Sequence, residues 1–353
     1  MSIQELEQGG AVRLFRGNVI SKKDMAREPG ECPVYSSSVH NNGLFGRYGR
    51  FMFDEELITW SVDGGGHFFY RPRHRFSVTN VCGYMRVNAS SVDCHFLSYQ
   101  LQRLHGQLSF DYTLKAHPSV IRGLYVVPLP GIEEQRSIAE ALSDADALIE
   151  SLEQLLTKKR QLKQGAMQVL LTGKKRLPGF SGEWQLKRLG EMLTICHGKG
   201  QHDVEALSGP YPILASGGEI GRSNRFLYDK PSVLIGRKGT IDQPQYMDTP
   251  FWTVDTLFYS VVHQPNHAKF LFYRFCLVNW RQHNEASGVP SLNARTIEAI
   301  EIRSPGPDEQ IAIAEVLSDL DVEIGALAAQ LGKARLLKQG MMQELLTGRT
   351  RLV

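Results

Sequence analysis

Long apolar runs are missing from this chain of 353 residues. No stretch approaches the roughly 18 consecutive apolar residues that a membrane-spanning helix needs. The first residues are acidic and lack the apolar core of a secretory signal, so we expect a cytoplasmic protein. The five cysteines are scattered and show no C-x-x-C spacing, which argues against a zinc site or a disulfide framework.

A strong charge of one sign is also absent. The 40 basic residues face 37 acidic ones, which leaves a net charge of only +3. Overall charge therefore neither requires nor excludes a nucleic-acid partner, and any DNA-binding site must be sought in local clusters.

Catalytic motifs are missing as well. The sequence contains no G-x-x-x-x-G-K-[ST] loop, no G-x-G-x-x-G after a strand, no H-E-x-x-H pair and no G-x-S-x-G elbow. The Asn/Asp-Pro-Pro-aromatic tetrapeptide typical of amino-methyltransferases is also absent. Two weak candidates are the Cys94-His95 pair and the glycine run 64–66, which could cradle a phosphate but is more typical of a tight loop. We therefore expect a binding protein with no catalytic or metal-ligating residues.

What the chain does contain is one long segment written twice. Residues 133–177 align without a gap on residues 308–352, and more than half of the aligned positions are identical. The offset is 175 residues, about half the chain, so the sequence indicates an internal duplication. A duplicated chain is expected to fold with a pseudo-two-fold repeat and to suit a two-part target or two copies of one partner.

The repeated segment is predicted to be helical, because apolar residues recur at spacings of three and four. We expect a short helix near 133–142, then a long one over 144–171, with the second long helix over 319–346. Ser143 and Ser318, each followed three residues later by aspartate, are predicted to cap the long helices. Gly173 and Gly348 are predicted to end them.

Neither helix can bury its apolar stripe alone, so the sequence favours an antiparallel coiled coil. About 28 residues at about 1.5 Å each predict a rod about 42 Å long, which would hold two globular halves one rod-length apart. The stripe residues assigned to this coiled coil or to partner contacts are Leu142, Ile149, Leu152, Leu156, Leu317, Ile324, Leu327 and Leu331.

The rest of each half, about 1–130 and 179–303, contains short β-branched and aromatic stretches separated by glycine and proline, which is typical of β-strands. Weak similarity extends the duplication into them, for example where 33–37 align with 212–216 and 76–80 with 251–255. The scaffold is therefore predicted to be shared while the loops have diverged. Reading two different half-sites would require such divergence, although neutral drift gives the same pattern.

Local basic and polar clusters fall in corresponding loops of the two halves. Arginine matches guanine and asparagine matches adenine, whereas lysine and serine favour phosphate. Each residue alone could equally be an ordinary surface group. The DNA-binding candidates are Ser36, Ser37, Asn41, Asn42, Arg47, Arg50, Arg71, Arg73, Arg75, Ser216, Arg222, Asn224, Arg225, Arg237, Lys238, Thr240, Ser291 and Asn293.

In its repeated helices and its second half, the chain resembles the specificity subunits of type I restriction-modification systems. The helical units ending in LLTGKKRL and LLTGRTRL, each preceded by E-Q-x-x-I-A-E, carry the resemblance most specifically. VLIGRKGT, PFWTVDTLFYS and VPSLN in the second half resemble that family's target-recognition domain. The first half departs from the pattern, since ITWSVDGGG stands where VLIGRKGT would be expected.

The resemblance implies a non-catalytic subunit whose two domains each read one half of a bipartite, asymmetric DNA site, with the paired helices as a ruler. It further implies docking of two methyltransferase subunits and of restriction/motor subunits. S-adenosylmethionine, ATP and Mg are then expected on those partners and not on this chain. Holding a bent or opened duplex while an adenine leaves the stack is a further hypothesis.

The predicted fold class is α+β: two mixed α/β target-recognition domains separated by two long helices. The predicted boundaries are 1–130 and 179–303 for the domains, and 131–178 and 304–353 for the helical spacers. Two alternatives remain open at this point. One is a self-contained DNA-modification enzyme with an unrecognised active site, and the other is a coiled-coil scaffold without a DNA role.

Overall fold

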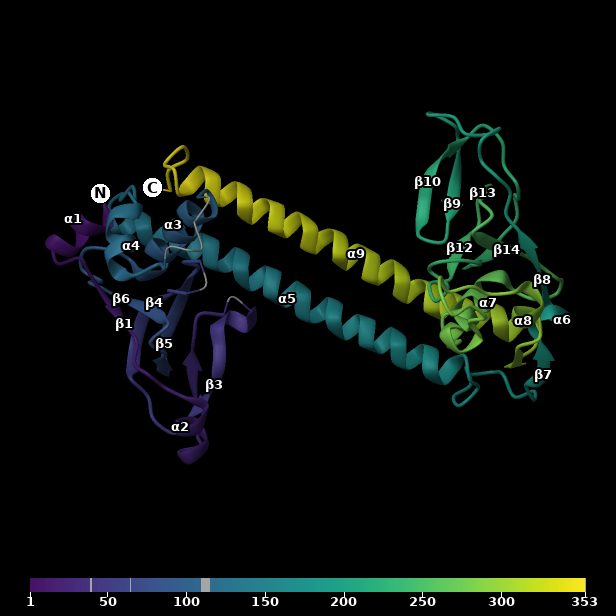
Figure 1. Cartoon of the computed structure of the whole chain (residues 1–353), viewed down its shortest axis with the longest axis horizontal. Helices are drawn as coiled ribbons and strands as arrows, with labels where there is room; N and C mark the ends of the chain where they lie inside the picture. Colours follow the sequence, from purple (N-terminus) through teal and green to yellow (C-terminus); the bar gives the residue numbers. More distant parts are fainter. Residues whose placement is uncertain (39, 64, 109–114, 353) are drawn as a thin grey trace. The chain divides into compact units, whose positions relative to one another are not determined.

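The computed structural model describes residues 1–38, 40–63, 65–108 and 115–352. The chain folds as two compact units (Figure 1). Unit 1 comprises Met1–Glu153 together with Gln330–Val353, and unit 2 comprises Gln154–Ala329. Each unit therefore contains one globular domain and a part of both long helices, α5 (Ile132–Leu170) and α9 (Pro307–Leu345).

The domain of unit 1 is built on a six-stranded sheet with the strand order β1-β6-β4-β5-β2-β3. The helix α3 (Cys94–Gly106) contacts β4 and β5. The other elements are β1 (Val12–Arg16), β2 (Cys32–Tyr35), β3 (Leu44–Tyr48), β4 (Phe53–Ser61), β5 (Phe68–Val78), β6 (Cys82–Val87), α1 (Ile3–Gln8), α2 (Lys22–Arg27), α4 (Pro118–Leu124) and the 3₁₀ turn η1 (His40–Gly43).

The domain of unit 2 repeats this plan with two smaller sheets, of order β12-β11-β14-β8 and β10-β9-β13, and a two-stranded ribbon of β7 and β15. The helix α7 (Ala268–Phe275) contacts β11 and β12. The other elements are β7 (Gln185–Arg188), α6 (Leu189–Met192), β8 (Leu193–His197), β9 (Tyr211–Ala215), β10 (Gly218–Ser223), β11 (Ser232–Gly236), β12 (Gln245–Met247), β13 (Trp252–Thr253), β14 (Leu257–Val262), η2 (Trp280–His283), α8 (Ala294–Glu298) and β15 (Glu301–Ser304).

The strand β5 joins the six-stranded sheet of unit 1 into one, whereas the corresponding strands of unit 2 lie in two separate sheets. The single strand β5 pairs with β4 along most of its length and with β2 at its end. In unit 2 the corresponding chain is broken into β12 and β13, and Pro250 lies between them. Proline cannot donate a ladder hydrogen bond, and β5 accommodates its own Pro72 at the bulge in its pairing with β4.

Each domain buries an apolar core between its sheet and its main helix. In unit 1, Ile58 and Trp60 of β4 cluster with Leu97 and Leu101 of α3. The indole of Trp60 leaves no room for a side chain at Gly83 of the adjacent strand, where a Cβ would lie 2.1 Å from the ring. In unit 2 the core around Val233 and Phe270 also includes Leu171 and Leu317 of the long helices. The long helices are therefore part of the domain cores and are not separate rods.

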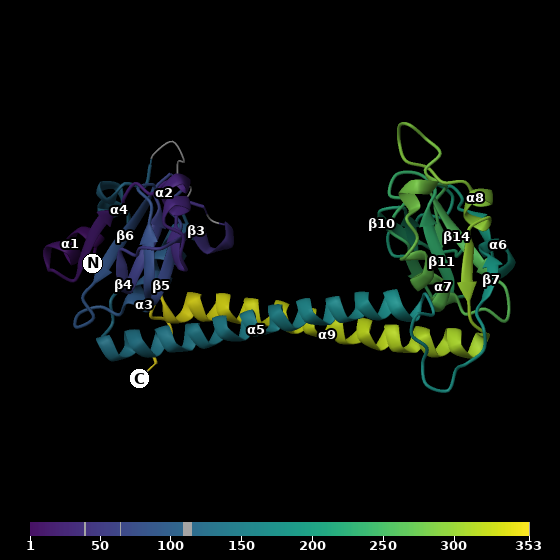
Figure 2. The same cartoon turned by 90° about the horizontal axis from the view of Figure 1, so that it is seen from below.

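Both long helices are longer than the sequence predicted. α5 and α9 each have 39 residues without a break (Figure 2), which corresponds to about 58 Å at about 1.5 Å per residue. The prediction of a short helix followed by a separate long helix is wrong. The predicted caps are wrong too, because Ser143 lies inside α5 and Ser318 donates its hydroxyl to the carbonyl of Ala314 one turn earlier in α9.

The predicted ends of the helices are confirmed. Gly173 and Gly348 follow the last turns with φ angles of +71° and +73°, a backbone conformation that glycine adopts without strain. The amide of Gly173 bonds the carbonyl of Leu170, and that of Gly348 bonds the carbonyl of Leu345. The true start of α9 is Pro307, whose fixed φ and missing amide hydrogen suit the first position of a helix.

Within each unit the two helices run antiparallel, because the ion pairs between them advance along α5 as they recede along α9. In unit 1 Asp146 binds Lys338 (2.5 Å) and Glu153 binds Arg335 (2.6 Å). In unit 2 Lys159 pairs with Glu323, and Lys163 with Asp321 (2.5 Å). Of the predicted stripe residues, Leu142, Leu156, Leu317 and Leu331 are buried, and Ile149, Leu152, Ile324 and Leu327 are partly buried.

In unit 1, three polar contacts join the domain to the helices and the segment after α9, and a fourth joins that segment to the start of α5. Tyr99 of α3 donates to Asp146 (2.7 Å), which also binds Lys338. The other three contacts run from Gln100 to the carbonyl of Leu346 (2.6 Å), from the amide of Asp93 to the side chain of Gln135 (3.0 Å), and from Arg351 to Glu134 (2.5 Å).

The same four contacts recur in unit 2 at corresponding positions. Tyr273 of α7 donates to Asp321 (2.7 Å), which also binds Lys163. Arg274 donates to the carbonyl of Leu171, the amide of His267 donates to Gln310 (2.9 Å), and Arg176 pairs with Glu309 (2.5 Å). Each domain is thus attached both to the start of one long helix and to the end of the other.

Candidate nucleic-acid interface

The β2–β3 hairpin carries the first group of predicted DNA-binding residues. Ser36 and Ser37 follow β2 and are partly buried: the Ser36 hydroxyl accepts from Thr79 (2.9 Å), and the Ser37 carbonyl accepts from Ser61 (2.7 Å). Asn41 and Asn42 lie in the turn η1 with φ of +49° and +51°, and both are exposed. The serines therefore hold the turn, and the asparagine amides are available to a ligand.

Arg47 and Arg50 lie on and just after β3, the edge strand of the sheet. Both are exposed, and each forms an ion pair, Arg47 with Glu31 (3.3 Å) and Arg50 with Glu28. Exposed ion pairs contribute about 0–1 kcal/mol, so phosphates can replace these carboxylates at low cost.

The three arginines predicted on β5 do not share a face. Relative to β4, β5 has one extra residue between Arg71 and His74, a β-bulge that reverses the alternation of side chains. Arg73 and Arg75 are exposed and lie near Asp54 (3.7 and 3.6 Å). Arg71 points the other way and is only 1% exposed, so the prediction of a surface DNA contact at Arg71 is wrong for this structure.

Arg71 instead supports the turn that carries the asparagines. Its Nη2 donates to the carbonyl of Asn42 (2.9 Å) and its Nε to the hydroxyl of Thr59 (3.0 Å). The guanidinium stacks over the ring of Tyr35, 3.7 Å from the centroid, while Nη1 has no hydrogen-bond partner. Burial lowers the pKa of Arg71 to about 10, so the group is still charged at neutral pH.

In unit 2, two predicted segments far apart in the sequence meet. Lys238 forms a β-bridge with Ser291, and the amide of Leu292 donates to the carbonyl of Arg237 (2.9 Å). A Cβ built on Gly239 would lie 3.3 Å from the hydroxyl of Ser216, so the end of β9 adjoins the same loop. The structure therefore brings Ser216, the 237–240 loop and the 290–293 segment together.

Four members of the unit 2 set have different surroundings. Asn293 caps the helix α8 by accepting from the amide of Arg295 (2.9 Å), so its side chain has a structural role. Arg222, Asn224 and Arg225 lie apart from the loop, on and just after the edge strand β10, and all are exposed. Arg222 pairs with Glu219 (2.8 Å).

The hairpins of the two domains have the same register. Arg47 lies opposite Pro33, and Arg222 lies opposite Pro212. Both hairpins also carry an irregularity at the same place, just before the turn. The turns themselves differ: eight residues, 36–43, lie inside the innermost pair Tyr35 and Leu44, whereas two, 216–217, lie inside the innermost pair Ala215 and Gly218.

The sequence reasoning missed two exposed phenylalanines beside these arginines. Phe51 follows Arg50, and Phe226 follows Arg225. Each side chain is 45% exposed, which is unusual for so large an apolar group. The signal was available, because both positions obey the offset of 175 residues that the helical repeat defines.

The weak catalytic candidates have structural roles. Cys94 is buried, and burial raises the pKa of its thiol. The His95 ring stacks on Tyr70 and on Tyr99, at 3.8 and 4.6 Å between centroids, and burial lowers its pKa. In the glycine run, Gly65 and Gly66 have positive φ and form a tight loop, whereas Gly64 lies outside the described residues.

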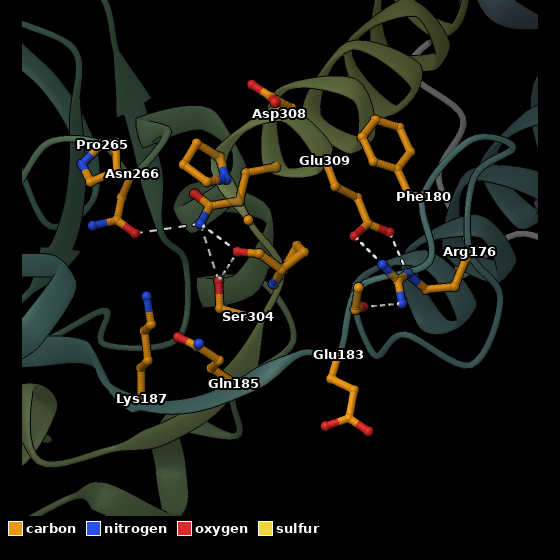
Figure 3. Close-up of a pocket in the computed structure, with 15 residues that line it drawn as sticks. Arg176, Phe180, Glu183, Gln185, Lys187, Pro265, Asn266, Ser304, Asp308 and Glu309 are labelled. Atoms are coloured by element: carbon orange, nitrogen blue, oxygen red, sulfur yellow. Dashed lines mark hydrogen bonds and ion pairs between the residues drawn. The ribbon is translucent and has the colours of Figure 1, made fainter.

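A cavity of about 480 Å³ lies in unit 2 where α9 begins (Figure 3). Its polar groups largely bind one another: Arg176 pairs with Glu309, and Gln310 donates to Ser304 (3.2 Å) and to the carbonyl of Pro305 (3.1 Å). A smaller cavity, about 190 Å³, lies at the corresponding place in unit 1 and includes Glu134 and Arg351. Both cavities are therefore part of the attachment between domain and helices.

Across the described ranges, His, Cys, Asp and Glu side chains nowhere gather in the groups of three or more that could hold a metal ion. Among the helices in the described part of the chain, none combines the length and apolar character needed to cross a membrane.

Comparison with known proteins agrees with this geometry. The family described as type I restriction modification DNA specificity domain matches residues 3–163 and again 181–331. A putative type I specificity subunit of Mycoplasma pneumoniae is 25% identical over 316 residues, which cover 86% of this chain and 85% of that protein. The MpnII specificity subunit of the same organism is 32% identical over 141 residues, 39% of this chain and 42% of that protein.

Solved structures show the same fold. The crystal structure of a type I restriction-modification S subunit from M. genitalium superposes with a TM-score of 0.75 at 16% identity, covering 98% of this chain and 95% of that one. The two matched repeats together span well over half of the sequence. The chain therefore belongs to the type I restriction-modification DNA specificity family, whose members are non-catalytic recognition subunits.

Proposed function

We propose that this chain reads a bipartite, asymmetric DNA site, with one half-site for each recognition domain. The domains comprise residues 1–130 and 179–303, and the helical segments 131–178 and 304–353 join them. The observation that carries the proposal is the pair of hairpins with identical register and unlike turns, eight residues against two. A shared scaffold with different turns suits two readers of different sequences.

The residues that would contact DNA in unit 1 are those of the hairpin turn and the exposed arginines, Asn41, Asn42, Arg47, Arg50, Arg73 and Arg75. In unit 2 they are Ser216, Arg222, Asn224, Arg225, Arg237, Lys238, Thr240 and Ser291. Asparagine and arginine supply the donors and acceptors that base edges and phosphates require.

The long helices would dock two methyltransferase subunits, and restriction/motor subunits would join the assembly. Several apolar side chains of α5 and α9 remain exposed, among them Leu148, Leu162, Val322, Leu336 and Leu337. Exposed apolar groups on a helix are typical of a partner surface. S-adenosylmethionine, ATP and Mg would be bound by those partners, and this chain would supply sequence recognition alone.

The experiment that tests the proposal is sequencing of modified bases in cells that express the chain together with its methyltransferase partners. We expect methylation at one motif made of two different half-sequences separated by unspecified bases, and its loss when the chain is deleted. A motif that survives the deletion, or a single uninterrupted motif, would contradict the proposal.

A further inference from the structure

Each domain has an edge strand on which exposed arginine and apolar side chains follow one another at the same spacing. In unit 1 these residues are Phe45, Arg47, Arg50 and Phe51, on and after β3. In unit 2 they are Ile220, Arg222, Arg225 and Phe226, on and after β10. Every member of the second set lies 175 residues after its counterpart. We call the two sets the arginine edges.

The apolar members of the arginine edges are exposed to solvent. The exposed fractions are 38% for Phe45 and 45% for Phe51, and 50% for Ile220 and 45% for Phe226. Single exposed apolar residues are common on protein surfaces. Two in each domain, at corresponding positions and beside arginines, are typical of an interface, where aromatic residues and arginine are enriched.

On each edge strand the exposed apolar residue lies two positions before the exposed arginine. Along β3, Phe45 and Arg47 are exposed and the residues between and around them are partly buried. Phe45 is the extra residue at the irregularity between Leu44 and Gly46, so regular alternation does not fix its direction, but its side chain and that of Arg47 are both open to solvent. Ile220 and Arg222 have this spacing on β10, and the matching register of the hairpins gives them the same relation to the neighbouring strand.

Protection of the sheet edge accounts for only part of this pattern. Charged residues on an edge strand prevent pairing with another chain. The arginines fit that role, but exposed phenylalanine and isoleucine on the same strands work against it. The apolar residues therefore point to a partner that covers the edge.

The charges around the arginine edge of unit 1 favour a polyanion. In unit 1, Lys22 lies over the ring of Phe45 at 5.9 Å from the centroid, and Arg75 lies over Phe51 at 4.9 Å. The carboxylates at the edge, the partly buried Glu28 and the exposed Glu31, are already paired with Arg50 and Arg47. In such surface pairs a phosphate can take the place of the carboxylate.

We propose that both arginine edges bind the phosphodiester backbone of the duplex, and that sequence is read by the hairpin turns and loops instead. The proposal rests on the proposed function above. Two domains that read different half-sites have only the sugar-phosphate backbone as a common target, so features kept in both fit the backbone. The arginines take phosphates, and the apolar side chains pack against deoxyribose.

If the arginine edges bind the backbone, the hairpin turns and loops are expected to supply the contacts that distinguish one base sequence from another. The turn of unit 1 is six residues longer than that of unit 2, and it presents Asn41 and Asn42. The loop of unit 2 presents Arg237 and Lys238, where the corresponding residues of unit 1 are Val62 and Asp63. These differences are placed where base-specific contacts are needed.

The test uses the full chain and a labelled duplex of arbitrary sequence, with affinity measured at several salt concentrations between about 50 and 200 mM. The variants are Arg47→Gln, Arg222→Gln and the double variant. Arg188→Gln is the matched control, because Arg188 is also exposed and ion-paired, with Glu301 (3.6 Å), but lies on β7 and belongs to neither edge.

We expect each single edge variant to reduce the slope of log affinity against log salt by about 0.9, and the double variant by about 1.8, because each lost phosphate contact removes one set of released counterions. Affinity should fall about equally for every duplex tested. The control should keep the slope of the wild type. Asn41→Gly, which suits the left-handed backbone at that position, should change the preferred sequence and keep the slope.

Unchanged slopes in Arg47→Gln and Arg222→Gln, with a salt-dependent wild type, would overturn the backbone assignment and leave the proposed function standing. The same assignment fails if the variants lose capture of methyltransferase subunits while the DNA slope is kept, since the edges would then be protein interfaces. A wild-type chain whose duplex binding does not depend on salt would contradict the proposed function itself.

Discussion

Arg71 shows how one buried side chain can shape a surface that it does not reach. Its guanidinium is enclosed by Tyr35, Phe69 and Thr59. It also donates a hydrogen bond to the carbonyl of Asn42. The planar guanidinium can stack and donate at once, which a lysine ammonium cannot. The turn with two left-handed asparagines therefore depends on this arginine for its conformation.

Replacing Arg71 by lysine is expected to destabilise unit 1. The change removes the stacking on Tyr35 and at least one of the two hydrogen bonds inside the sheet, so we expect a loss of about 2 kcal/mol in the free energy of unfolding. Chemical denaturation of the full chain measures this loss. Arg73→Lys is the control, because Arg73 lies two residues along the same strand and is exposed. Equal stability of the two variants would show that the buried contacts contribute little.

The residues of the candidate interface were predictable from composition and spacing, but their orientation was not. The alternation of side chains along a regular strand would put Arg71, Arg73 and Arg75 on one face. A single extra residue in β5 separates Arg71 from the other two. Nothing in the arginine pattern itself reveals such a bulge, because it is set by pairing with β4. The capping role of Asn293 likewise depends on where α8 begins.

At the scale of elements, Asp146 and Asp321 explain why the capping prediction failed. The pattern of serine and aspartate is typical of a helix start. In the folded chain each aspartate instead accepts from a tyrosine of the domain helix and binds a lysine of the other long helix. Tertiary contacts with α3 and α7 therefore account for the aspartates, and the helix continues through them.

Asp146→Asn and Asp321→Asn are expected to lower the free energy of unfolding by about 1–3 kcal/mol each, because a tyrosine hydroxyl and a partly buried lysine lose a charged acceptor. The chain offers a matched control at each site. Asp144 and Asp319 lie two residues earlier in the same helices and are exposed, so their asparagine variants should stay within about 0.5 kcal/mol of the wild type. Thermal and chemical unfolding give the comparison.

The paired helices also allow a test with two adjacent leucines. Leu156 is 6% exposed and Leu155 is 41% exposed. Leu156→Glu places a charge in the buried seam and should cost about 3 kcal/mol or more, with loss of helical signal on mild heating. Leu155→Glu changes the same residue type on the exposed side and should leave the melting curve nearly unchanged. Similar losses in both variants would contradict the buried seam.

At the scale of the whole molecule, the duplication predicted two related halves, two long helices and their antiparallel pairing. The sequence order of domain, helix, domain, helix did not reveal how the compact units are composed. Unit 1 takes its last part from Gln330–Val353, and unit 2 is one continuous stretch. Contacts such as Arg351 with Glu134 join residues more than 200 positions apart, and local patterns carry no information on such pairs.

Two substitutions in different units should change different halves of the recognised site. Arg237→Gln acts in unit 2 and Asn41→Gly acts in unit 1. We expect each variant to relax the base preference in one half of the methylated motif and to leave the other half intact. Sequencing of modified bases in cells that carry each variant measures both halves at once. A variant that altered both halves equally would show that the domains do not read independently.

Because unit 1 includes the last segment of the chain, the two units can complete their folding at different stages of translation. The ribosome has delivered every residue of unit 2 once it passes position 329, so that unit can complete its core while the chain is still growing. Unit 1 must wait, since Phe96 and Leu142 are covered by Leu345 and Leu346 from the final turn of α9. The half that is translated first is thus the half that finishes folding last, and until release it presents an open apolar face to chaperones.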